Sequence, residues 1–131
     1  MKITADTNVL VRALTEDHIQ QSKAAQIALN KADMVALTIP TLCELVWVLR
    51  SYRIQSSDIA TTLRCLLGGT NIVVNRPAAE AGMAVLEAGG DFADGVIAYE
   101  GNWLGADTFV SFDKKAVSLI EAQGKSAKLL S

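Results

Sequence analysis

The fold class of this chain is decided by one stretch, Met34-Val-Ala-Leu-Thr-Ile-Pro-Thr-Leu-Cys-Glu-Leu-Val-Trp-Val-Leu-Arg50. Its first residues, 34–38, are mostly apolar and predict a short buried strand. Pro40 suits the first turn of a helix, and the apolar run behind it predicts a long helix to about Tyr52. A buried strand that passes directly into a long helix is typical of α/β proteins.

The same alternation continues on both sides of that stretch. Further strands are expected at 2–5, 72–74, 108–112 and 127–130. Helices are expected at 7–14, 19–31, 58–67, 91–104 and 114–122, with one more between Asn75 and Gly89. Short, apolar strands that alternate with helices predict a parallel sheet covered on both faces. We therefore expect a single three-layer α/β/α domain over residues 1–131, with a short, mostly parallel central sheet.

The composition fits a folded protein, with 50% hydrophobic and 20% charged residues among 131. No stretch approaches the ~20 apolar residues of a membrane span, and the N-terminus lacks a signal-peptide core, so a cytoplasmic protein is expected.

Cys43 and Cys65 lack the spacing of a zinc site and are interpreted as core thiols. The single histidine, His18, is expected at the surface, which leaves general-base chemistry to carboxylates or a metal.

Two aspartates directly follow predicted strands. Asp6 follows the first strand, and Asp113 follows the strand at 108–112. In open α/β sheets, ligands bind beyond the carboxyl ends of the strands. Each aspartate could equally cap the helix that it precedes. The two roles are compatible, because a carboxylate can accept several hydrogen bonds.

Two further acids lie within or at the start of predicted helices. Glu44 stands among apolar residues, where a carboxylate is costly unless a metal or an arginine such as Arg50 or Arg12 compensates it. Asp91 and Asp94 share one face at a helix start. Asp91 is well placed as the cap, which makes Asp94 the better site candidate.

Carboxylates without histidine or cysteine are hard oxygen ligands, which suit Mg²⁺ or Mn²⁺. One or two such ions could hold a phosphodiester and activate water. The net charge of −2 does not by itself indicate a nucleic-acid binder, but a bound metal would reverse the sign of the site. Arg12, Arg50 and Lys114 are candidates for contacting a phosphodiester backbone.

Four segments resemble the acidic motifs of PIN-domain nucleases, and more narrowly those of VapC-type toxins of bacterial toxin–antitoxin modules. They are Ala5-Asp-Thr-Asn-Val-Leu-Val-Arg12, Thr41-Leu-Cys-Glu-Leu-Val-Trp-Val-Leu49, Gly89-Gly-Asp-Phe-Ala-Asp-Gly-Val-Ile-Ala98 and Phe109-Val-Ser-Phe-Asp-Lys-Lys-Ala116. The motifs occur in the family's order and cover essentially the whole chain. The resemblance implies that the catalytic metal ligands are Asp6, Glu44, Asp94 and Asp113, supported by Asn8 and Ser111. Asp91 lies in the third motif as a second acid, which is not a fixed feature of the family.

The resemblance further implies a Mg²⁺- or Mn²⁺-dependent endoribonuclease that acts on structured RNA, such as tRNA or ribosomal RNA. Such proteins commonly dimerise and are held inactive by a VapB-type antitoxin. A PIN nuclease with another task in RNA processing is the alternative. Two unrelated classes fit less well: a haloacid-dehalogenase phosphatase would need an aspartate where Asn8 stands, and a Mg²⁺-binding signalling module would leave Glu44 unexplained.

Overall fold

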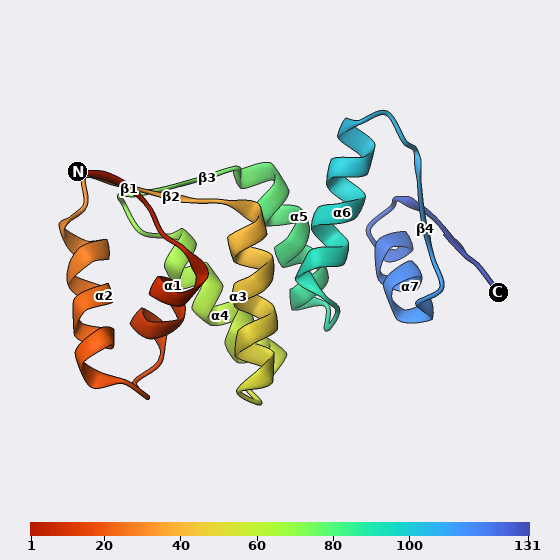
Figure 1. Cartoon of the computed structure of the whole chain (residues 1–131). Coiled ribbons are helices and arrows are strands. Elements are labelled where there is room, and N and C mark those ends of the chain that lie inside the picture. The colour runs from red at the N-terminus through yellow and green to blue at the C-terminus, as the bar shows by residue number, and fades with distance from the viewer. The chain divides into compact units, whose positions relative to one another are not determined.

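Seven helices and five strands follow one another in the computed structural model, which describes all residues from Met1 to Ser131 (Figure 1). They form two units, Met1–Asn75 and Arg76–Ser131. None of the helices combines the length and apolar character needed to cross a membrane.

The first unit contains a parallel sheet and four helices. In chain order its elements are β1 (Lys2–Thr4), α1 (Thr7–Leu14), α2 (Ile19–Lys31), β2 (Met34–Leu37), α3 (Ile39–Ser51), α4 (Ser56–Leu67) and β3 (Ile72–Val74). The strand order is β1-β2-β3, and both pairs are parallel. Val35 pairs with Ile3 on one side and Ile72 on the other, which places these three side chains on one face.

That face of the sheet is the covered one. Val35 and Leu37 are almost completely buried. The opposite face carries Thr4, Ala36 and Val73, and Val73 is 53% exposed. A threonine and an alanine offer little apolar area to bury, so this face contributes less to the core than the face of Val35 and Leu37.

Helix α3 supplies much of the core of the first unit. Thr38 caps it by accepting a hydrogen bond from the N–H of Thr41, and Pro40 lies in its first turn as predicted. Its buried side chains recur at helical spacing and include Leu42, Leu45, Val46 and Leu49. Each buried leucine contributes about 1.5–3 kcal/mol.

The second unit contains α5 (Arg76–Glu87), α6 (Phe92–Trp103), β4 (Thr108–Ser111), α7 (Lys114–Ala122) and β5 (Ser126–Leu129). Strands β4 and β5 pair in parallel. Helices α5 and α6 approach closely at two glycines. A Cβ on Gly95 would collide with the carbonyl oxygen of Ala81, and a Cβ on Gly82 would lie 2.6 Å from the Phe92 ring. The glycines therefore permit this helix contact.

The predicted α/β class, the parallel pairing and the order of the elements are confirmed. Two expectations need correction. The strands form two parallel sheets, of three and two strands, where one central sheet was expected. Cys65 is exposed and Cys43 half-buried, so the interpretation of Cys65 as a core thiol was wrong. The reason is its position on α4, whose buried face is formed by Ile59, Ala60, Leu63 and Leu67.

Candidate functional site

Asp6 is fixed at the start of α1, as its position after β1 predicted. Its Oδ1 accepts a hydrogen bond from the N–H of Val9 at 3.0 Å, so it is the helix cap. The side chain is exposed and borders a groove of about 530 Å³ between α1 and α2. Asn8 lines the same groove. The structure therefore brings together Asp6 and Asn8, the first motif acid and its expected polar support.

Arg12 lines this groove too but is already engaged within the first unit. Its Nε donates to Gln21 at 2.7 Å, and its Nη1 pairs with Asp17 at 3.2 Å. Asp17 also accepts hydrogen bonds from the hydroxyls of Thr15 and Tyr52. The Thr15 hydroxyl, followed by that of Tyr52 and the Arg12 charge, holds the pKa of Asp17 below its ordinary value. A contact of Arg12 with RNA would compete with this network and stays a prediction.

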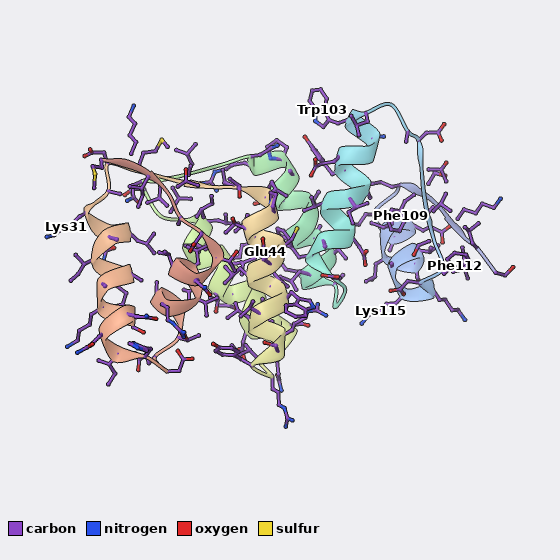
Figure 2. All side chains as sticks on the ribbon, in the orientation of Figure 1. Lys31, Glu44, Trp103, Phe109, Phe112 and Lys115 are labelled. Carbon is purple, nitrogen blue, oxygen red and sulfur yellow. The ribbon has the colours of Figure 1, made fainter.

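Glu44 lies on the exposed side of α3, so the apolar environment expected for it was wrong (Figure 2). The apolar residues around it in sequence turn to the opposite side of the helix, while its neighbour Trp47 is 73% exposed. No basic side chain pairs with Glu44. Its carboxylate is therefore accessible to solvent and pays no large desolvation cost.

The acids of the third motif lie at the start of α6. Asp91 caps the helix by accepting from the N–H of Ala93 at 3.3 Å, as expected. Asp94 is half-buried in the first turn, and its own N–H donates to the carbonyl of Asp91 at 3.1 Å. A carboxylate in a first turn is favoured by the partial positive charge of the helix N-terminus.

Asp113 is held by three hydrogen bonds at the start of α7. Its Oδ1 accepts from the N–H groups of Lys115 at 3.0 Å and Ala116 at 3.2 Å, which caps α7. Its own N–H donates to the hydroxyl of Ser111 at 2.9 Å. Ser111 therefore helps to fix the turn that presents Asp113. Lys114 is exposed at the first position of α7.

The candidate residues are divided between the two units. Asp6, Asn8 and Glu44 belong to the first, while Asp91, Asp94, Ser111 and Asp113 belong to the second. Neither unit by itself gathers three or more acidic, histidine or cysteine side chains that could hold a metal. Within the units, the structure joins Asp6 with Asn8, and Ser111 with Asp113.

A second groove, of about 440 Å³, lies in the second unit and was not anticipated from the acidic motifs. It runs along α6 beside β4, and its lining includes Asn102, Thr108, Lys125 and Ser126. The aromatic residues Tyr99 and Trp103 of α6 are spaced one helical turn apart and are not part of this lining.

Comparison with known proteins identifies the family. A family model described as the PIN domain matches residues 3–119, a range that includes all four motif acids. No curated protein matches the chain significantly.

Proposed function

The chain belongs to the PIN-domain family, and on that premise we propose that it is a Mg²⁺- or Mn²⁺-dependent endoribonuclease that cleaves structured RNA. PIN domains are typically metal-dependent nucleases. The observation that carries the proposal is that the family match spans both units and includes every motif acid, Asp6, Glu44, Asp94 and Asp113.

The donor chemistry of these residues fits a hard divalent cation. All four are carboxylates, the ligands that Mg²⁺ and Mn²⁺ prefer. Asp6, Glu44 and Asp113 are exposed and form no ion pair, so no lysine or arginine already neutralises them. We propose that these four carboxylates hold one or two ions. When bound, a divalent ion offsets phosphate charge and lowers the pKa of water.

The chain's own residues would orient the reaction partners. Asp6 and Asp113 each use one oxygen to cap a helix, which fixes the direction of the carboxylate. Ser111 holds the backbone of Asp113, and Asn8 adds an exposed amide beside Asp6. Arg50 and Lys114, both exposed, are proposed to contact the RNA backbone, together with Arg12 if it leaves Asp17.

The nuclease assignment is tested with substitutions that leave the helix caps intact. Asparagine caps a helix about as well as aspartate, so Asp6→Asn and Asp113→Asn remove a charge but keep the fold. Both variants are expected to melt normally and to lose cleavage of a structured RNA in Mg²⁺ or Mn²⁺. Wild-type cleavage is expected to stop in EDTA. Full activity of either variant, or activity in EDTA, would contradict the mechanism.

We further propose that the protein is the toxin of a type II toxin–antitoxin module, acting as a homodimer on tRNA or ribosomal RNA in the cytoplasm. The support is the resemblance of its four motifs to those of VapC-type toxins. A VapB-type antitoxin could inhibit it with an arginine, whose two-pronged guanidinium pairs with carboxylates such as Glu44 or Asp113 and competes with the metal.

The toxin assignment is tested by inducing the chain alone in a bacterial host, and then together with its neighbouring gene. Growth arrest is expected for the wild type, not for Asp6→Asn, and the neighbouring gene should relieve it. Harmless expression of a folded, active nuclease would leave a PIN nuclease with a role in RNA processing. Metal binding without any cleavage would instead favour a non-catalytic Mg²⁺-binding signalling module.

A further inference from the structure

We propose that Tyr99, Trp103 and Lys125 form a stacking site for an unpaired nucleotide of RNA. All three residues belong to the second unit. The inference rests on the proposed ribonuclease function, because it names a part of the substrate that the enzyme would grip away from the carboxylates.

Trp103 is a large aromatic side chain held in a fixed position at the surface. It is 77% exposed at the C-terminal end of α6, where its ring points away from the helix (Figure 2). Its indole Nε1–H donates to the hydroxyl of Tyr99, one turn earlier, at 2.7 Å. The bond satisfies the only polar atom of the ring and restricts its rotation. A flat apolar surface is thus presented to solvent, which suits a base that stacks.

A cation accompanies the aromatic pair. The Nζ of Lys125 lies 5.9 Å from the centre of the Tyr99 ring, within the range of a cation–π interaction. Lys128 is exposed on the adjacent strand β5. Aromatic rings that stack bases, next to lysines that attract phosphates, are the combination by which proteins bind single-stranded nucleic acid.

The groove of about 440 Å³ adds hydrogen-bonding groups beside this pair, and it shares Lys125 with it. The hydroxyls of Thr108 and Ser126 lie 3.2 Å apart on its wall, and the amide of Asn102 also lines it. Such groups can donate to or accept from the edge of a base. Asp107 lines the groove as well and accepts from Thr108, so the phosphate is expected near Lys125 and not near Asp107.

An exposed tryptophan also occurs in protein interfaces. The lysine over the neighbouring ring and the hydroxyl- and amide-lined groove favour a nucleotide, because they supply the charge and the polar contacts that a nucleotide needs. If RNA binding does not depend on Trp103, the exposed tryptophan would instead be interpreted as part of an interface with a protein partner.

The test measures binding without cleavage. The chain has two tryptophans, so Trp47→Phe leaves Trp103 as the only one. In EDTA, a single-stranded oligoadenylate should quench the Trp103 fluorescence saturably, whereas inorganic polyphosphate, which lacks bases, should not. By fluorescence anisotropy, Trp103→Ala should weaken oligoadenylate binding by about 5- to 100-fold, and Trp103→Phe should keep most of the affinity.

The matched control is Leu104→Ala, which removes a 90% exposed neighbour that cannot stack, and it should bind like the wild type. Tyr99→Phe removes only the hydroxyl that fixes the indole and should weaken binding by a smaller factor. All variants should melt like the wild type. Wild-type protein that does not bind oligoadenylate, or Trp103→Ala that binds it equally well, would overturn the stacking site.

The outcome is separable from that of the ribonuclease proposal. Binding that depends on Trp103 in a protein that never cleaves RNA would refute the nuclease and keep the stacking site. Metal-dependent cleavage by a protein whose RNA binding is unchanged in Trp103→Ala would support the nuclease and refute the stacking site.

Discussion

Three aspartates of this chain have a structural role at helix starts, and for two of them, Asp6 and Asp113, we also propose a catalytic one. Asp6, Asp91 and Asp113 each cap a helix through backbone N–H groups. The caps were predictable, because an aspartate just before an apolar helical pattern is a strong local signal. Capping fixes the direction of the carboxylate, and a fixed ligand loses less freedom when it binds a cation.

Asp113 allows the two roles to be measured separately. Asp113→Ala removes the acceptor for Lys115 and Ala116 and should lower the free energy of unfolding by about 0.5–2 kcal/mol. Asp113→Asn keeps the cap and should change stability little. Both should abolish cleavage, as urea unfolding and an RNA assay on the same samples would show. If Asp113→Ala unfolds like Asp113→Asn, the capping bonds do not stabilise α7.

Asp17 provides a prediction of pH dependence. Hydrogen bonds from Thr15 and Tyr52 and the charge of Arg12 lower its pKa in the folded state below 3.8. A lowered folded-state pKa means that this stabilisation is present at neutral pH and is lost as the pH falls through 3.8 toward the folded-state value. Asp17→Asn should therefore be less stable than wild type at neutral pH, and the difference should shrink on acidification.

The control for Asp17 is Glu16→Gln, which removes an adjacent exposed carboxylate without such partners. Its stability should run parallel to that of the wild type across the same pH range. Thermal melts at a series of pH values measure both. A constant difference between Asp17→Asn and wild type would show that the ionised carboxylate is not what matters.

At the scale of the element, α3 shows what a sequence pattern leaves open. Its strand–helix junction and its first turn were predicted, because Pro40 and the apolar run act locally. The exposure of Glu44 was not predicted. Apolar residues occur almost all round this helix, so the pattern does not say which side meets the core. Contacts with other elements decide that, and they are not local in sequence.

Helix α6 offers a matched pair of glycines. Gly95→Ala would drive a Cβ into the backbone of α5 and should lower the free energy of unfolding by about 1–3 kcal/mol. Gly101 lies in the same helix, and a Cβ added there would meet nothing within 4 Å, so Gly101→Ala should raise stability by up to about 1 kcal/mol. Denaturant unfolding would compare the two. Equal effects would mean that α5 and α6 are not in close contact.

For the molecule as a whole, the sequence predicted the order of elements better than their pairing. The αβ alternation follows from local periodicity, and it was confirmed from β1 to β5. The number of sheets depends on which strands meet, and strands of only three or four residues specify that weakly. Likewise, the four motif acids were found from their order along the chain, whereas their common site is a proposal that needs a test of its own.

Metal-dependent stability provides that test. A cation that binds only the folded protein stabilises it by mass action, by about 2.7 kcal/mol at a concentration roughly 100 times its Kd. We expect Mn²⁺ and Mg²⁺ to raise the melting temperature, and EDTA to reverse the rise. Asp6→Asn and Asp113→Asn should both reduce the shift, because both carboxylates are proposed ligands of the ion.

Glu44→Gln should also reduce the shift. In EDTA it should melt like the wild type, because the exposed carboxylate of Glu44 has little desolvation cost to relieve. Glu121→Gln, at an exposed position of α7 outside the motifs, is the control and should keep the full shift. A shift lost in Asp113→Asn but retained in Asp6→Asn would assign the ion to the second unit alone. A melting temperature that neither Mg²⁺ nor Mn²⁺ changes would contradict the proposed metal site. It would also contradict the proposed hydrolysis, which depends on the charge of a bound ion.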